Sequence, residues 1–197
     1  WRKVPVYVAS QFAGALLGGL MIYALFAPSI AAYEAAHQIA RGSAESVVTA
    51  KMFGEFYGCA GGAARVPWPL AMGAEALGTF LLVLMIFALT EGCNVGRPND
   101  AFAPVFIGLT VTSVICLVAP LTQAGLNPAR DLGPRLVAWL MGWGAAAFPD
   151  RTGGFFTVYV LSPVVGAVAA ARFFVGVLEP AMRSVPEPCA CEKRRTS

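Results

Sequence analysis

Charged residues are scarce in this sequence. Lys, Arg, Asp and Glu make up 13% of its 197 residues and hydrophobic residues make up 57%, whereas an average soluble domain is about 25% charged. A soluble fold of this size needs a more polar surface, so the shortage of charge predicts a membrane protein. The formal net charge of +3 is too small and too scattered to indicate a nucleic-acid partner, although positive charges can still orient the chain in a bilayer.

Histidine and cysteine are scarce as well. The single histidine, His37, cannot be grouped with a nucleophile, a base and an orienting residue, which argues against an enzyme. The five cysteines show no paired metal-ligand spacing: Cys59, Cys93, Cys116, Cys189 and Cys191. The last two form a Cys-x-Cys step that could be a weak metal or redox site, but free cytosolic thiols are the favoured interpretation. We expect no metal and no cofactor.

Long apolar stretches take up most of the chain. A helix crosses the roughly 30 Å of bilayer hydrocarbon with about 20 mainly apolar residues. Four stretches meet this requirement: residues 4–27, 67–89, 101–119 and 155–178. Small residues recur at helical spacing in the first and last of them (Gly14 with Gly18, Gly166 with Ala170). Such steps let helices approach closely, and although glycine is common in membrane helices generally, together they favour a tight bundle.

The positive charges give an orientation. Basic residues stand before the first stretch, between the second and third, and after the fourth: Arg2, Lys3, Arg97, Arg183, Lys193, Arg194 and Arg195. Four crossings bring both ends of the chain to one side, and the positive-inside rule places that side in the cytoplasm. Residues 28–66 then face outside, and residues 120–154 must leave and return on that same outer face.

The returning segment contains the sequence LTQAGLNPARDLGPRL, residues 121–136. Residues 128–139 predict a helix of about 18 Å, too short to cross the bilayer but long enough to reach its midplane. Asn127 is a favoured N-cap, and Pro128 suits the first helical position. The sequence therefore predicts a re-entrant half-helix whose N-terminus points into the membrane, which is tolerated only where the backbone is buried in protein or lines an aqueous cavity.

Arg130 lies one turn into this half-helix. A cation beside a helix N-terminus opposes the helix dipole, so stability does not explain it. The favoured interpretation is a guanidinium that donates hydrogen bonds to a neutral solute while repelling protons and cations. The alternative is an amphipathic surface helix with a snorkelling arginine. Asp131 and Arg135, four residues apart, are expected to form a mutual salt bridge.

Glu75 is a second charged residue in an unfavourable place, because it lies inside the second apolar stretch, where a carboxylate loses its hydration. An intramembrane carboxylate indicates a function by default. Three roles are open. It could accept hydrogen bonds from the backbone of the loop before Asn127, couple protons in an active transporter, or be a protonated core residue. We favour the first.

Together these residues resemble the aquaporin (major intrinsic protein) superfamily, and within it the glycerol uptake facilitator (aquaglyceroporin) branch. The segment GLNPARDLGPRLVAWLMGWG is similar to the family's second signature loop. The segments RKVPVYVASQFAGA, HQIARGSAESV, AEALGTFLLVLMIFALT and SPVVGAVAAARFF are similar to bacterial glycerol facilitators in order and spacing. The resemblance runs from Trp1 to about residue 178.

The resemblance implies a fold, an assembly and a partial chain. The family has six spanning helices and two half-helices in two inverted repeats, and each subunit of its homotetramer carries a pore. This chain would hold four of the six spans. Residues 1–27 match the last span of the first repeat, 28–66 an extracytoplasmic connecting loop, 67–178 the second repeat, and 179–197 a cytoplasmic tail expected to be disordered. The first Asn-Pro-Ala loop is not in the sequence, and with a start at Trp1 rather than methionine we expect an upstream segment.

The resemblance also implies roles for single residues. Asn127 matches the pore asparagine and Arg130 the selectivity-filter arginine. Ala124 falls where glycerol facilitators usually carry an aromatic residue, and Ile115 where water-selective members carry histidine. This pairing widens the expected constriction and is similar to that of plant nodulin-like channels, which pass glycerol and metalloid acids.

Supporting residues follow in the same way. The carbonyl groups of Gln123, Ala124 and Gly125 would line the outer vestibule, and Glu75 would brace their loop. The remaining matches support the half-helix or resemble the glycerol-conducting type: Pro128, Ala129, Asp131, Arg135, Pro163 and Val164.

The expected fold is thus an all-α membrane protein, an aquaporin-like inverted-repeat helical bundle with one re-entrant half-helix. The expected function is a passive channel in a bacterial inner membrane for glycerol, water, urea and metalloid acids. Two alternatives stay open: a non-conducting truncated paralogue or assembly partner, and, less favoured, a secondary transporter, which would also use broken helices.

Overall fold

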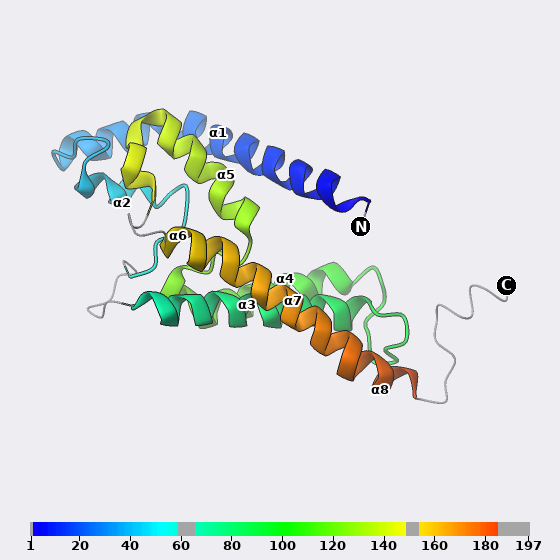
Figure 1. The fold of residues 1–197 in the computed structure, drawn as a ribbon. Coiled ribbons are helices and arrows are strands. Elements are labelled where there is room, and N and C mark those ends of the chain that lie inside the picture. Colours follow the sequence, from blue (N-terminus) through cyan, green and yellow to red (C-terminus); the bar gives the residue numbers. More distant parts are fainter. Residues whose placement is uncertain (1, 59–65, 149–153, 185–197) are drawn as a thin grey trace.

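The computed structural model describes residues 2–58, 66–148 and 154–184. Within these ranges all regular structure is helical, and four helices are long and apolar enough to cross a membrane. They are α1 (Val4–Ala36), α3 (Trp68–Thr90), α4 (Ala103–Thr122) and the run Gly154–Arg183 (Figure 1). The predicted all-α membrane fold is confirmed.

The first helix is longer than predicted. Its expected end at residue 27 is wrong, because α1 continues to Ala36 with Pro28 in its interior. A proline removes one backbone hydrogen bond and often ends a helix. In α1 the turns after Pro28 are stabilised by residues of the segment that follows the helix. Glu34 is buried and accepts hydrogen bonds from Arg41 Nη2 and Thr49 Oγ1, each at 2.8 Å.

The last helical run is assembled from five consecutive pieces: α6 (Gly154–Phe156), η4 (Thr157–Leu161), α7 (Ser162–Phe173), η5 (Phe174–Leu178) and α8 (Glu179–Arg183). Both η4 and η5 are π-helical turns, which widen a helix locally. The expected disordered tail is wrong at its start, because residues 179–183 continue this run as α8. Residues 185–197, with Cys189 and Cys191, lie outside the described ranges.

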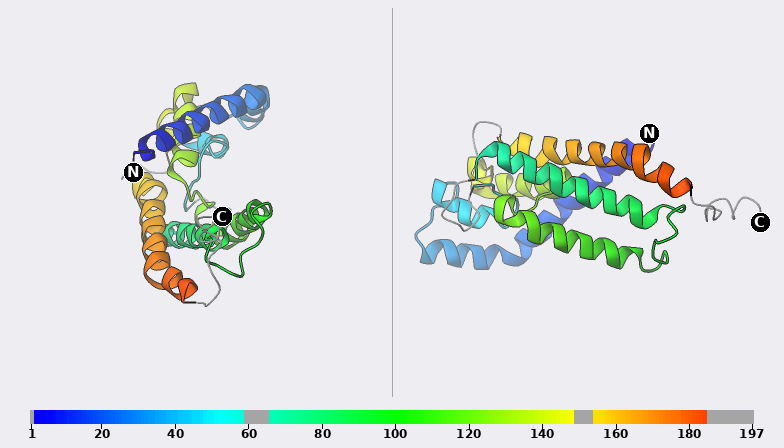
Figure 2. Two further views of the ribbon diagram at one scale, coloured as in Figure 1. Left: turned by 90° about the vertical axis from the view of Figure 1, so that its right-hand side faces the viewer. Right: turned by 90° about the horizontal axis from the view of Figure 1, so that it is seen from below.

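The helices form two groups. In one, α3 packs against α4 and α7 and lies between them in the left-hand view of Figure 2. In the other, α1 packs along α5 (Pro128–Ala138), the half-helix after α4. Glycines make this second contact close. A Cβ atom on Gly133 would lie 2.5 Å from Ala15 Cβ, and one on Gly19 would lie 2.7 Å from Pro134 Cα.

Residues 37–58 form a connecting segment that follows α1 and leads toward α3. This segment contains the short helices η1 (Ala44–Ser46) and α2 (Val47–Ala50). It packs on the turns after α5, η2 (Trp139–Trp143) and η3 (Gly144–Ala147). The buried cluster at this contact consists of Ile30, Ala50, Phe53, Phe56, Ala138, Trp143 and Ala147. The connecting segment is therefore fixed against the half-helix rather than loose.

Replacing Gly166 with alanine is expected to destabilise the α3–α7 contact. A Cβ atom there would lie 2.1 Å from the Ala76 carbonyl oxygen, so the helices must separate. Forcing a methyl group into a packed contact costs about 1–3 kcal/mol. Thermal unfolding in detergent should show a clearly lower midpoint. Gly108→Ala is the matched control, because nothing lies within 4 Å of that position. An equal midpoint for the two variants would contradict this packing.

Candidate functional site

The loop between α4 and α5 has an unusual backbone. Helix α4 ends at Thr122, and Gln123, Ala124 and Leu126 have φ angles of 65°, 65° and 57°. Residues with a side chain seldom adopt this left-handed region, and each such residue costs about 1–3 kcal/mol unless its surroundings hold it. The loop is therefore strained, and something must keep it in shape.

Glu75 of α3 holds this loop. Its side chain is fully buried, and its two oxygens accept from two successive backbone groups: Gly125 N–H to Oε1 at 2.9 Å and Leu126 N–H to Oε2 at 2.7 Å. Tyr159 adds a further tie by donating its hydroxyl to the Thr122 carbonyl at 2.9 Å. This geometry agrees with the first of the three roles considered for Glu75, in which it accepts hydrogen bonds from the loop backbone.

The start of the half-helix follows the sequence prediction. Asn127 is the N-cap of α5, and its Oδ1 accepts from Ala129 N–H at 2.9 Å and Arg130 N–H at 3.4 Å. Pro128 occupies the first helical position, where its missing N–H leaves no unpaired group. The predicted helix start is confirmed. Backbone and cap together direct the N-terminus of α5 toward the strained loop.

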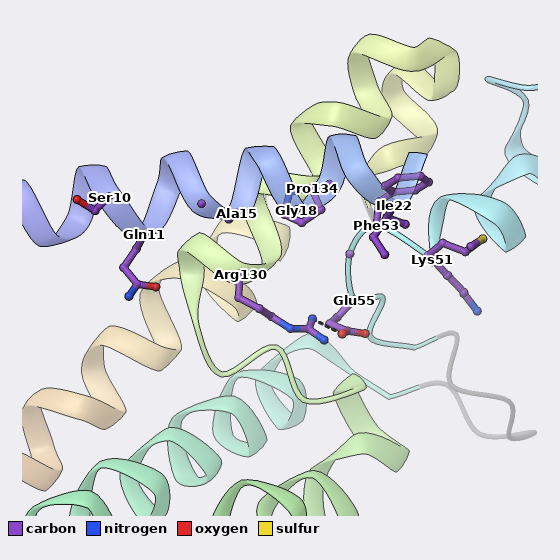
Figure 3. Close-up of a pocket in the computed structure, with 14 residues that line it drawn as sticks. Ser10, Gln11, Ala15, Gly18, Ile22, Lys51, Phe53, Glu55, Arg130 and Pro134 are labelled. Atoms are coloured by element: carbon purple, nitrogen blue, oxygen red, sulfur yellow. Dashed lines mark hydrogen bonds and ion pairs between the residues drawn. The ribbon is translucent and has the colours of Figure 1, made fainter. Parts of the chain in front are cut away.

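Arg130 extends from this helix end into a cavity of about 570 Å³. The cavity lies between α1, the connecting segment and α5 (Figure 3). Its lining includes Gln11, Gly14, Gly18, Lys51 and Glu55. Figure 3 shows the Arg130 side chain directed at Glu55, and Arg130 Nη1 forms an ion pair with Glu55 Oε1. An electrostatic partner thus faces the predicted filter arginine.

The sequence analysis did not identify Glu55. It lies 75 positions before Arg130, in a glycine- and aromatic-rich stretch without a spacing rule that links the two. Its side chain is only 12% exposed, against 53% for Arg130. Burial raises the pKa of Glu55 above its usual range, and the nearby Arg130 charge acts in the opposite direction.

Asp131 and Arg135 form the predicted salt bridge, with Arg135 Nη2 2.8 Å from Asp131 Oδ1 and both side chains buried. The pair also binds the connecting segment at one residue. Glu55 N–H donates to Asp131 Oδ1 at 2.7 Å, and Arg135 Nη2 donates to the Glu55 carbonyl at 2.6 Å. The guanidinium lies 4.8 Å from the ring centres of Phe56 and Phe155. The pair therefore fixes the backbone of Glu55 next to α5.

The other predicted site residues are not gathered around this cavity. Asn127, Ala124 and Ile115 are not among its lining residues in the described chain. Ala124 is buried in the loop, and Ile115 is 41% exposed on α4. Gln123 Oε1 accepts from Phe56 N–H at 2.8 Å, and the Gly125 carbonyl accepts from Asn127 N–H at 2.7 Å. The Gln123 side chain thus ties the loop to the connecting segment.

A second charged cluster was also missed. Arg41 Nη2 lies 2.8 Å from Glu34 Oε2, and its guanidinium lies 4.2 Å from the Trp143 ring centre. Trp143 Nε1 donates to Thr49 Oγ1 at 2.9 Å, which in turn donates to Glu34. The hydrogen bond to Glu34 raises the pKa of Arg41 above its ordinary value. This cluster holds the connecting segment to α1 and to the turn after α5.

The cysteines differ from one another. Cys116 is free and exposed, whereas Cys93 is disulfide-bonded. The free-thiol interpretation concerned Cys189 and Cys191, which lie outside the described residues. Cys59 lies outside the described residues. Within the described ranges no group of three or more His, Cys, Asp and Glu side chains could hold a metal ion.

Residues 1–174 match the family described as Major intrinsic protein. The chain belongs to this family. It is 40% identical over 179 residues to the propanediol uptake facilitator of Salmonella typhimurium, and the match covers 89% of this chain and 66% of the relative. The glycerol uptake facilitator protein of Escherichia coli K12 is 35% identical over 201 residues, covering 100% and 67%.

A solved structure supports the fold of this major intrinsic protein. The aquaglyceroporin from Plasmodium falciparum superposes with a TM-score of 0.76 at 22% identity, over 94% of this chain and 68% of that one. The chain thus spans about two thirds of the length of each of these relatives. Family membership and four helices of spanning length and composition make it a multi-pass membrane protein.

Proposed function

We propose that this protein is part of a passive transmembrane channel for glycerol and other small neutral solutes, including short diols, water, urea and metalloid acids. The observation that carries the proposal is the N-terminus of α5. An Asn127-capped half-helix meets a loop held by Glu75, and it presents Arg130 to a cavity. Irregular backbone of this kind at membrane depth is typical of solute pathways.

The chemistry favours a neutral, hydroxylated solute. Small residues of α1, Gly14, Ala15 and Gly18, line the cavity together with Arg130. A polyol can place hydroxyl groups on the polar side and C–H groups on the other. An ion would lose its hydration shell without enough ligands to replace it. The names of the relatives, which refer to propanediol and glycerol uptake, agree with this solute class.

The wider assignment follows the family. We place the protein in a bacterial cell membrane as a homotetramer, with both ends of this chain cytoplasmic and the connecting segment outside. Asn127, Arg130, Ala124 and Ile115 are proposed to face the solute, with the carbonyl groups of Gln123, Ala124 and Gly125 in the vestibule. Pro128, Ala129, Asp131 and Arg135 support the half-helix. The non-conducting protein and the secondary transporter remain the competing hypotheses.

Solute flux tests the proposal. The protein, produced from its native gene and reconstituted in liposomes, should let glycerol equilibrate down its gradient and should not accumulate it when a proton gradient is applied. Light scattering reports the first and radiolabelled glycerol the second. Absence of flux would favour the non-conducting hypothesis, and uphill accumulation would favour the transporter.

Replacing Arg130 with alanine tests the filter. The variant loses a fixed positive charge and leaves the Glu55 carboxylate without its ion-pair partner. We therefore expect protons and small cations to leak, with a conductance rise of about tenfold or more for a change above 1.4 kcal/mol in the barrier. Arg97→Ala is the control, since Arg97 pairs with Asp100 in the α3–α4 connection. Unchanged ion exclusion in Arg130→Ala would remove Arg130 from the filter.

A further inference from the structure

Two positive features meet at the start of α5. The helix begins at Pro128, so the positive end of its dipole favours a negative group nearby, while Asn127 Oδ1 already accepts from the N–H groups of Ala129 and Arg130. Arg130 adds a full positive charge within the first turn. A guanidinium beside a helix N-terminus is good chemistry for binding carboxylates, sulfonates and phosphates. In a channel for neutral solutes such a site would be a liability, because a small anion could lodge there and block the path.

Glu55 already supplies a carboxylate to the Arg130 guanidinium. Its Oε1 pairs with Arg130 Nη1, and both residues line the same cavity (Figure 3). The backbone that carries this carboxylate is fixed in place. The Glu55 backbone is held at both its N–H and its carbonyl, by Asp131 Oδ1 at 2.7 Å and Arg135 Nη2 at 2.6 Å. The chain therefore supplies its own anion to Arg130 in a fixed position.

We propose that Glu55 is a specificity-determining residue that fills the anion site at Arg130 from within the chain, so that small external anions neither bind there nor block the passage of neutral solutes. The proposal rests on the proposed function. It adds Glu55 as a residue that determines specificity, and it names a class of molecule that the channel excludes. That class is the small organic anion of about the solute's own size.

The pair remains able to handle hydroxyl groups. A guanidinium has five N–H donors and a carboxylate has about four lone-pair sites, so one shared contact leaves most of them available. Donors from Arg130 and acceptors from Glu55 then stand side by side in the cavity. A solute with hydroxyl groups on neighbouring carbons can use both at once, whereas an anion is repelled by the carboxylate.

The test is Glu55→Gln, with sodium methanesulfonate as the anion. Glutamine keeps the shape of the side chain and leaves both backbone contacts of residue 55 in place, so the variant should fold. Glycerol flux of each protein is measured with and without methanesulfonate, and the ratio is compared. We expect Glu55→Gln to bind the anion about tenfold more tightly than the unchanged protein, as for one added charge-assisted hydrogen bond, and to lose flux accordingly.

Glu45→Gln is the matched control. It makes the same change of charge in the same connecting segment, on an exposed side chain away from the cavity lining. Its flux ratio should equal that of the unchanged protein. A ratio that fell equally in both variants would mean that the overall charge of the segment, rather than Glu55, sets the response, and would overturn the proposal.

A binding measurement separates this proposal from the channel assignment. Methanesulfonate should raise the melting temperature of Glu55→Gln in detergent and leave that of the unchanged protein where it is, because a ligand stabilises only the state that binds it. If no protein conducts, the proposed function fails, and the melting shift alone decides the role of Glu55. If Glu55→Gln gains neither flux block nor melting shift, Glu55 does not fill an anion site.

Acidification gives the same result without mutation. Burial raises the pKa of Glu55, so it takes up a proton at a higher pH than an ordinary glutamate. The charged and titratable groups that act on it are Arg130, Asp131, Arg135 and Tyr159, and Lys51 also lines the cavity. As the pH falls, the ion pair with Arg130 is lost and methanesulfonate, which stays ionised, should begin to block. Glu55→Gln should show no such pH dependence, and a parallel pH response in both would contradict the mechanism.

Discussion

Replacing Glu75 with leucine is expected to abolish solute flux and to lower the free energy of unfolding by several kcal/mol. Leucine is close in volume but accepts no hydrogen bond, so Gly125 N–H and Leu126 N–H both lose their partner. Each buried polar group left unpaired costs about 1–3 kcal/mol. The left-handed residues of the loop, Gln123 and Ala124 among them, would then have nothing to hold their strained backbone.

Glu75→Gln separates the competing roles of this residue. Glutamine offers one acceptor oxygen and one amide group, so only one of the two loop N–H groups keeps a partner. A channel braced by Glu75 should show partial loss of stability, and whatever flux is left should follow the glycerol gradient at any pH. A proton-coupled transporter should instead fold normally and lose uphill transport. Thermal unfolding in detergent and radiolabelled glycerol uptake, with and without a proton gradient, distinguish these outcomes.

Local features of the fold could be predicted from the sequence because their signals are local. The Asn127-Pro128 step contains its own reasons for starting a helix, a side-chain cap and a missing N–H. Asp131 and Arg135 face each other because four residues make about one helical turn. The spans follow from hydropathy and length, except where α1 passes Pro28, since the contacts that hold its last turns come from Arg41 and Thr49 in the next segment.

The acidic partner of Arg130 could not be predicted, for a physical reason. Seventy-five positions separate Glu55 from Arg130, and no periodicity relates them. What joins them is tertiary: the buried pair of Asp131 and Arg135 fixes the backbone of Glu55, and Gln123 fixes that of Phe56. The sequence indicates a costly arginine in an apolar setting. The carboxylate of Glu55 comes close to this arginine only when the connecting segment folds onto α5.

Breaking the buried pair of Asp131 and Arg135 should have the largest effect on stability. Arg135→Met removes the guanidinium and leaves the Asp131 carboxylate buried without compensation, with the Glu55 and Ala147 carbonyls also losing a donor. Removing one partner of a buried ion pair costs about 3–5 kcal/mol. Asp131→Asn should cost a similar amount, and the double variant should cost less than the sum, because no lone charge is left inside the protein.

An exposed pair of the same spacing provides the control. Arg183 Nη2 lies 2.6 Å from Glu179 Oε1, again one helical turn apart, but the Arg183 side chain is 57% exposed. Water and salt screen such a pair, so Arg183→Met should change the free energy of unfolding by less than about 1 kcal/mol. Unfolding of all four variants in detergent gives the comparison. Equal small effects at both pairs would mean that Asp131 and Arg135 do not anchor the connecting segment. A large effect at Arg135 alone, together with weakened methanesulfonate exclusion, would show that the pair keeps Glu55 against Arg130.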